Sequence, residues 1–124
     1  MYKLYLDDIR EPKQSYRHME DTVYLQTDWV VVRTYQEFCD VLRGFGLPVL
    51  VSFDHDLGDK AYASVDMSAE AMKKLDEKTG YDCAKFLCEY CMDSSQPLPP
   101  YLVHSWNPVG ADNIRKYLES FNGN

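Results

Sequence analysis

The chain has 124 residues, of which 45% are hydrophobic and 27% are charged, and its formal net charge is −7. That length allows one domain with a substantial hydrophobic core but not two, and the composition is ordinary for a soluble globular protein. The negative charge argues against a broad surface for duplex nucleic acid, although a small basic pocket would still allow a phosphate to bind. The sequence therefore predicts a single domain over 1–124 that does not bind long duplexes.

The sequence has no feature of a membrane or secreted protein. It contains no run of about 18 apolar residues, and its N-terminus begins with a strand-like segment rather than a basic stretch followed by an apolar one. We therefore expect a cytoplasmic protein that does not contact a membrane.

The four cysteines allow a metal or redox interpretation as well as a structural one. Cys88 and Cys91 have the spacing of a zinc half-site or a redox pair. The second half of a zinc site is missing, and Cys83 joins Cys88 and Cys91 in one apolar helical pattern. The pattern favours packing in the hydrophobic core.

Apolar and β-branched segments predict four short strands, at 1–6, 29–33, 49–53 and 101–104. Helical spacing of apolar residues predicts helices that begin near Thr34, that cover 81–92 and that cover 108–121, with Pro108 in the first turn. The alternation predicts a three-layer α/β fold of about four parallel strands in the order 2-1-3-4, flanked by helices.

Two segments fit this alternation less well. The segment 9–28 has no clear helical period and is predicted to be a long loop with at most one short helical turn. The polar segment 59–79 is predicted to hold a marginal helix over 68–77, ended by Gly80. It is either a lid over the site or an insertion that covers the sheet.

Carboxylates follow two of the predicted strands. Asp7 and Asp8 come directly after 1–6, and Asp54 and Asp56 flank His55 after 49–53. Ligands of open α/β sheets bind outside the carboxyl ends of the strands, so both groups are predicted to face one crevice. Several carboxylates in one place repel one another unless a cation is present, and their hard oxygens suit magnesium or manganese.

Other polar residues are predicted to reach the same edge of the sheet. His55 follows one predicted strand and His104 ends the neighbouring one, and the two are predicted to act as an acid and base pair across a phosphodiester. Each alternatively serves only as a hydrogen-bond partner. Arg10 either binds phosphate or balances the acids at the surface. The remaining candidates for phosphate contact are Ser105, Asn107 and Asp82.

Five motifs carry a resemblance to a known family. The motifs are LYLDDIREP, WVVVRTYQEF, VSFDHDLG, TGYD and HSWNPVGADNI, and they cover nearly the whole chain. Together they resemble the cyclic-phosphate processing receiver domains. The resemblance implies a truncated receiver-like (flavodoxin-like) fold and an activity on cyclic phosphates or phosphate ends in nucleotide or RNA metabolism.

The resemblance also implies residue roles. In receiver domains, a pair of acids and a third acid bind magnesium. The third acid accepts a phosphoryl group, which a Ser or Thr contacts. Asp7 and Asp8 match the pair, Asp54 matches the third acid, and Ser105 matches the Ser or Thr. The usual fifth strand and its lysine have no counterpart, which argues against phosphorelay signalling.

We therefore expect a metal-dependent phosphoesterase that acts on a cyclic phosphate or a related nucleotide phosphodiester. Asp7, Asp8 and Asp54 are expected to bind the metal, and His55 and His104 to act as acid and base, with Asp56 as a further ligand or acid. The substrate is expected to be a small nucleotide or phosphate-ended RNA. The alternative is a degenerate receiver that accepts a phosphoryl group at Asp54 or binds a nucleotide without cleaving it. The oligomeric state is left open, since Tyr2, Tyr5 and Trp106 suit an interface as well as a core or pocket.

Overall fold

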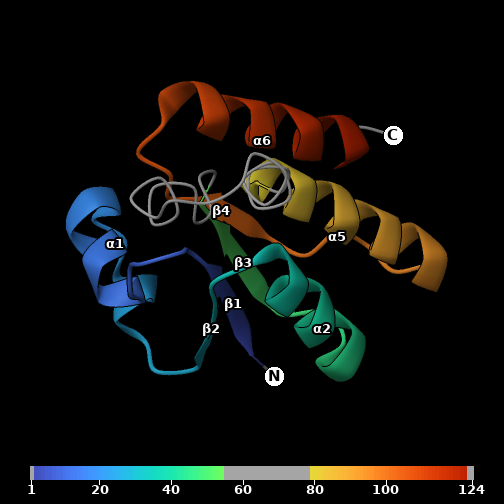
Figure 1. Cartoon of the computed structure of the whole chain (residues 1–124), viewed down its shortest axis with the longest axis horizontal. Coiled ribbons are helices and arrows are strands. Elements are labelled where there is room, and N and C mark those ends of the chain that lie inside the picture. Colours follow the sequence, from blue (N-terminus) through green and yellow to red (C-terminus); the bar gives the residue numbers. More distant parts are fainter. Residues whose placement is uncertain (1, 55–78, 123–124) are drawn as a thin grey trace, which may run out of the picture.

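The sheet has the predicted strands and the predicted order. The structure is a computed structural model that describes residues 2–54 and 79–122. Its strands are β1 (Lys3–Leu6), β2 (Trp29–Val32), β3 (Leu50–Phe53) and β4 (Tyr101–Val103). They are all parallel and lie in the order β2-β1-β3-β4 (Figure 1). The chain thus has the receiver-like, flavodoxin-like α/β architecture expected from its sequence.

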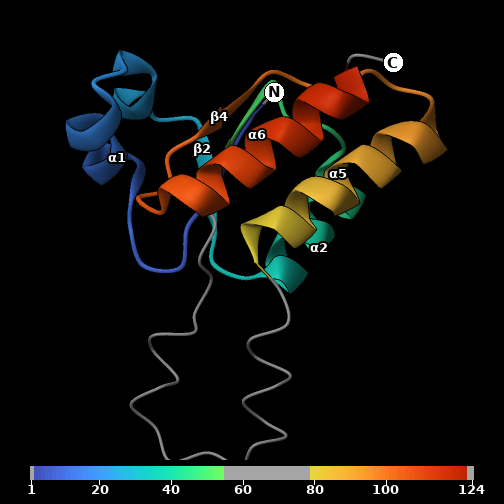
Figure 2. The same cartoon turned by 90° about the horizontal axis from the view of Figure 1, so that it is seen from above.

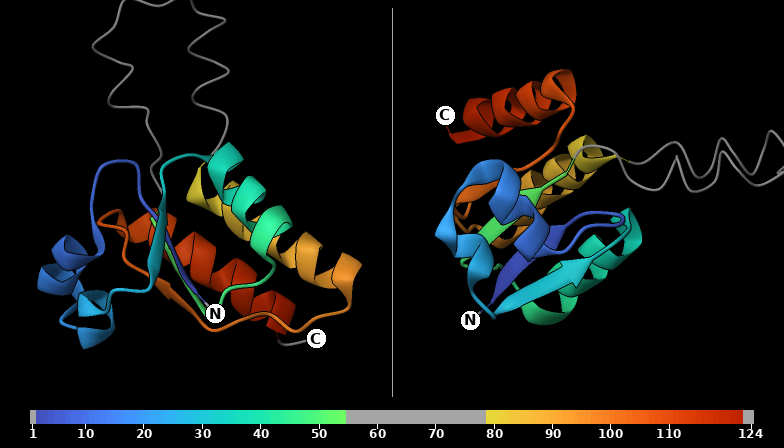
Figure 3. Two further views of the ribbon diagram at one scale, coloured as in Figure 1. Left: turned by 90° about the horizontal axis from the view of Figure 1, so that it is seen from below. Right: turned by 90° about the vertical axis from the view of Figure 1, so that its left-hand side faces the viewer.

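Helices cover both faces of the sheet. One face packs on α2 (Tyr35–Phe45), α5 (Gly80–Ser94) and α6 (Pro108–Asn122), and the other lies against α1 (Pro12–Met19) and the 3₁₀ helix η1 (Thr22–Leu25). Figure 1 shows α1 on the opposite side of the strands from α2 and α5, and Figures 2 and 3 show α5 and α6 side by side. The sheet is therefore the middle of three layers.

The alternation of side chains along the strands divides the interior into two parts. Leu4, Leu6, Val51 and Phe53 belong to the apolar core beneath α2, α5 and α6. Residues between them point to the other face because successive side chains of a strand alternate. There the Ser52 hydroxyl lies 2.7 Å from the phenol oxygen of η1 residue Tyr24, and both groups are buried. The second face thus holds a buried polar network rather than a purely apolar core.

The helix α1 differs from the prediction of a loop with at most one turn over 9–28. It has eight residues, and Glu11 and Gln14 form a reciprocal capping box at its start, with Pro12 in the first turn. Its buried residues are only Pro12 and Ser15. The helix was missed because its ends and polar contacts stabilise it, so it lacks the apolar period that indicates a helix in sequence.

The start of α5 also differs from the prediction. Thr79 is the N-cap residue and forms a capping box with Asp82, so Gly80 is the first residue of this helix. The predicted helix at 68–77 and nearly all of the predicted lid at 59–79 lie outside the described residues. Elsewhere the predicted boundaries agree with the structure to within one or two residues, and Thr34 and Pro108 stand at the starts of α2 and α6 as expected.

All four cysteines are buried free thiols, which confirms the prediction that they pack in the core. Burial raises the pKa of Cys91 and raises the pKa of the Cys88 thiol to about 12. Thiolates are the reactive form, so native protein in neutral buffer is expected to react very slowly with a disulfide reagent. Protein unfolded in guanidinium should react with four equivalents of the reagent, one for each cysteine. Rapid reaction of any thiol in the native protein would contradict this packing.

None of the helices in the described part of the chain is long and apolar enough to cross a membrane.

Candidate functional site

Three carboxylates meet at the carboxyl edge of the sheet. Asp7 and Asp8 follow β1, and Asp54 follows the neighbouring strand β3. The backbone N–H of Asp54 donates to the carbonyl of Leu6, so pairing of the two strands fixes where the acids lie. One ligand oxygen from each of the three acids lies within 4.8 Å of the others. This set, called the acidic cluster below, is the meeting of carboxylates expected from the sequence.

Both carboxylate oxygens of Asp7 have hydrogen-bond partners. Its Oδ1 accepts hydrogen bonds from the backbone N–H groups of Ile9 and Arg10, at 3.0 and 2.9 Å. Its Oδ2 lies 3.1 Å from His104 Nε2 and 3.4 Å from Arg10 Nη1. Burial by itself would raise the pKa of this carboxyl, but the hydrogen bonds from His104 and the two backbone groups lower the pKa to about 2. Asp7 is therefore an anion at neutral pH.

The acidic cluster suits a divalent cation. Carboxylate oxygens are the ligands that magnesium and manganese prefer, and receiver domains bind Mg²⁺ at acidic residues in this position. Four hydrogen bonds reach the two carboxylate oxygens of Asp7, two to each oxygen. The contact from the Arg10 side chain is the longest of them, so we expect a metal ion to displace that guanidinium and leave the backbone contacts intact.

A chain of buried hydrogen bonds ends at the carboxylate of Asp7. The phenol of Tyr24 lies 2.7 Å from Ser52 Oγ, which lies 2.6 Å from Nδ1 of His104. The other ring nitrogen of His104 contacts Asp7. The imidazole also stacks on the ring of Tyr5, with a centroid separation of 4.5 Å and an angle of 5°. Each member of this network, called the Tyr24–Asp7 network below, is buried.

Burial decides the protonation of the Tyr24–Asp7 network. It lowers the pKa of His104, against the opposing effect of Asp7, and it raises the pKa of Tyr24 to about 12. Tyr24 therefore keeps its proton and donates to Ser52, which donates to Nδ1 of a neutral His104. The tautomer that this pattern requires carries its proton on Nε2 and donates to Asp7.

The position of His104 bears on its predicted role. Its side chain has no solvent exposure, and both ring nitrogens already have partners. In this arrangement it reaches a substrate only through Asp7, as a residue that orients the carboxylate. Its direct acid/base role stays a prediction, and so do the roles of His55 and Asp56, which lie outside the described residues.

Two of the predicted phosphate contacts lie together in the loop after β4. Ser105 Oγ accepts the backbone N–H of Asn107 at 3.1 Å, and Asn107 Oδ1 accepts the backbone N–H of Gly110 at 3.0 Å. Asn107 thereby caps α6. Among the described residues nothing accepts the Ser105 hydroxyl proton or the Asn107 amide protons, so both residues keep donors for an anion.

Asp82 has a clear structural task. Its Oδ2 accepts the backbone N–H of Thr79 at 2.8 Å and lies 3.3 Å from the Thr79 hydroxyl, which makes it part of the capping box of α5. Its predicted contact with substrate stays a prediction.

Sequence reasoning missed three residues that shape the site. Tyr24 and Ser52 hold His104, and Arg33 binds the loop after β1 by donating to the carbonyls of Asp7 and Arg10, at 3.2 and 2.5 Å. Ser52 carried a usable signal, because it is the sole polar residue of the segment 49–53. The other two lie far from their partners in sequence and gave no such signal.

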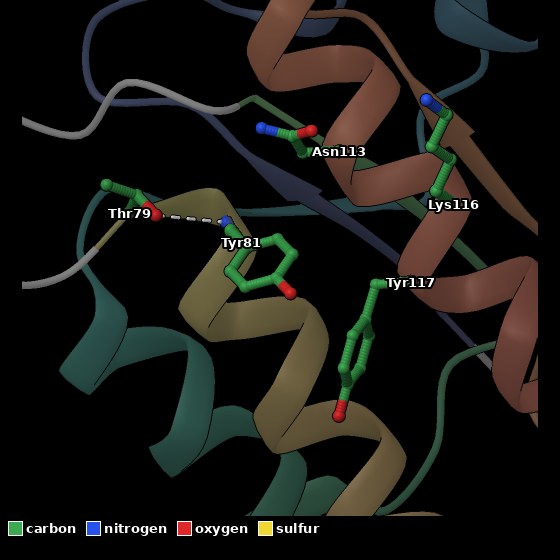
Figure 4. Close-up of a pocket in the computed structure, with 5 residues that line it drawn as sticks. All are labelled: Thr79, Tyr81, Asn113, Lys116 and Tyr117. Atoms are coloured by element: carbon green, nitrogen blue, oxygen red, sulfur yellow. Dashed lines mark hydrogen bonds between the residues drawn. The ribbon is translucent and has the colours of Figure 1, made fainter.

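A separate hollow of about 580 Å³ lies between α5 and α6 (Figure 4). Thr79, Tyr81, Asn113, Lys116 and Tyr117 line it. Lys116 is exposed and its Nζ lies 3.1 Å from Asp112 of its own helix, while the rings of Tyr81 and Tyr117 meet edge to face. Among the described residues, this hollow shares none with the acidic cluster.

A parallel sheet in the order 2-1-3-4, with acids at the carboxyl ends of β1 and β3, defines a receiver-like domain. The family model of the cyclic-phosphate processing receiver domain matches residues 2–120. The chain therefore belongs to this family, and the family resemblance noted in its motifs is confirmed. Neither the curated proteins nor the solved structures give a significant match.

Proposed function

We propose that the protein is a metal-dependent enzyme that hydrolyses a cyclic phosphate or a related nucleotide phosphodiester. The observation that carries the proposal is the acidic cluster, in which Asp7 is kept ionised beside Asp8 and Asp54. Membership of a family associated with cyclic-phosphate processing supports the choice of substrate.

The hydrolysis adds one water molecule to the ring. The water oxygen forms a bond to phosphorus, one ester P–O bond breaks, and the leaving oxygen gains a proton while the water loses one. The product is a phosphomonoester. A divalent cation bound by Asp7, Asp8 and Asp54 would supply positive charge to the phosphate oxygens.

The side chains around the acidic cluster have distinct proposed tasks. Arg10, Ser105 and Asn107 point donors at the phosphate and fix its orientation. His55, with Asp56 beside it in sequence, is the proposed group that exchanges a proton with the substrate directly. His104 is proposed to act through Asp7, whose carboxylate it orients.

A second candidate function is a binding or phosphoacceptor module. The complete burial of His104 favours it, because an imidazole with no solvent exposure does not protonate a leaving group by itself. In this case Asp54 accepts a phosphoryl group, or the site binds a nucleotide without cleavage. Incubation with acetyl phosphate and magnesium distinguishes this function, because a stable mass increase that Asp54→Asn removes would support it.

The proposed enzyme is tested by turnover of a substrate panel. The panel contains 2′,3′-cyclic nucleotides, 3′,5′-cyclic nucleotides and RNA with a cyclic-phosphate end, each with magnesium, with manganese and with a chelator. We expect cleavage of at least one class with metal and none with chelator. Absence of cleavage throughout the panel would contradict the enzyme, and cleavage that persists in chelator would contradict the role of the metal.

A further inference from the structure

Three side chains from distant parts of the sequence meet beside the acidic cluster. The indole of Trp106, in the loop after β4, stacks on the imidazole of His18 in the last turn of α1, with centroids 4.7 Å apart and an angle of 27°. The guanidinium carbon of Arg10 lies 4.7 Å from the centroid of the same indole. We call this group the Trp106 platform.

The Trp106 platform remains open to solvent despite these contacts. Trp106 is 59% exposed, and Ile9 in the loop after β1 and Val109 in the first turn of α6 are 70% and 71% exposed. Single exposed hydrophobic residues are common on protein surfaces, but here each lies within two residues in the chain of a polar site residue. More than half of the Trp106 surface therefore remains accessible to a ligand beside its contacts with His18 and Arg10.

Arg10 joins the Trp106 platform to the acidic cluster. Its Nη1 lies 3.4 Å from Asp7 Oδ2 while its guanidinium carbon lies over the indole. Ser105 and Asn107, the two donors proposed for phosphate, are the neighbours of Trp106 in the chain. A ligand with its phosphate at the acidic cluster would thus have its next chemical group within reach of the platform.

The chemistry of the Trp106 platform selects a planar aromatic group. Indole and imidazole rings stack on nucleobases, and an arginine beside them adds a cation–π contribution. A simple alkyl ester has no π-face and gains little from such a surface. The net charge of −7 argues against a long nucleic acid strand, so a single nucleotide or the last nucleotide of a strand suits the site best.

We propose that the Trp106 platform binds the base of a nucleotide whose phosphate lies at the acidic cluster. The inference rests on the proposed function for the position of the phosphate, and it adds the determinant by which the protein prefers nucleotides to base-free phosphate esters. Because stacking tolerates every base, the preference is expected to extend to all four nucleotides.

The test compares 2′,3′-cyclic AMP with glycerol 1,2-cyclic phosphate, which lacks a base, by kcat/KM in the wild type and in Trp106→Ala. The wild type is expected to prefer the nucleotide by roughly 10-fold or more, and Trp106→Ala to lose most of that preference, read as the ratio of the two kcat/KM values within each protein. Trp106→Phe should keep much of the preference. The matched control is Phe45→Ala, which removes another exposed aromatic ring, at the far end of α2, and should behave as the wild type.

A second measurement separates this inference from the proposed function. Calorimetry with adenosine 3′-monophosphate and manganese reports binding without turnover. Binding that weakens roughly 10-fold in Trp106→Ala would support the platform even if no cyclic ester were opened. An equal affinity in the two proteins, or no binding by either, would contradict the proposed base-binding role of the Trp106 platform. Equal wild-type kcat/KM values for the two cyclic esters would also contradict that role, but they would leave the proposed enzyme intact.

Discussion

Adding magnesium or manganese to metal-free protein is expected to raise its melting temperature by roughly 10 °C. Binding to the folded state alone stabilises it by about 2.7 kcal/mol when the free metal is 100-fold above Kd, and a domain of this size gains about 3–6 °C for each kcal/mol. Asp54→Asn removes one of the three carboxylates of the acidic cluster and is expected to lose most of this shift. Differential scanning fluorimetry with metal and with chelator measures both effects.

The control for this prediction is Asp93→Asn. Asp93 is exposed near the C-terminal end of α5, so the substitution removes the same charge away from the acidic cluster. It should keep the full metal-induced shift. Equal shifts in Asp54→Asn and in the wild type would show that metal stabilises the protein from another place.

Replacing His104 by alanine is expected to destabilise the protein by about 3 kcal/mol. The change removes one buried partner each from Asp7 Oδ2 and Ser52 Oγ, which keep only Arg10 and Tyr24, and it removes the ring that stacks on Tyr5. We also expect metal affinity to fall by roughly 10- to 100-fold, because His104 orients a proposed metal ligand. Urea unfolding and manganese titration at a temperature where the variant is folded measure the two effects.

Two further variants separate orientation of Asp7 from mere stability. His104→Gln places an amide N–H donor near the position of Nε2 and should recover part of the metal affinity. Leu118→Ala is expected to cost about 2–5 kcal/mol in the core beneath α6 but to leave metal affinity unchanged. If His104→Ala and Leu118→Ala bound manganese equally well, His104 would have only a structural role.

The acidic cluster was predictable because its residues obey local rules. Asp7 and Asp8 follow one apolar segment and Asp54 follows another, and parallel strands bring such positions to one edge. The strand order followed from right-handed crossovers and short connections. Recognising each strand and the acids after it needed only patterns within a few residues, and the topology rules then brought the strand ends together.

The support beneath the acidic cluster was not predictable in the same way. Tyr24 meets Ser52 across 28 residues, and Ser52 meets His104 across 52. The helices α1 and η1 hold Ser15 and Tyr24 against the sheet through polar contacts. The sequence therefore has no apolar periodicity that would indicate these two helices. His104 was expected to face a substrate because it follows a strand, whereas its place on the α1 side of β4 buries it.

The central claim, that the acidic cluster processes a cyclic phosphate, is tested most directly by phosphorus NMR. A 2′,3′-cyclic nucleotide is incubated with magnesium and either the wild type or Asp54→Asn, and the cyclic resonance is followed over time. We expect the wild type to convert it into a monoester resonance, and chelator or Asp54→Asn to abolish the conversion. An unchanged cyclic resonance with the metal-loaded wild type, or equal conversion by the variant, would contradict the account.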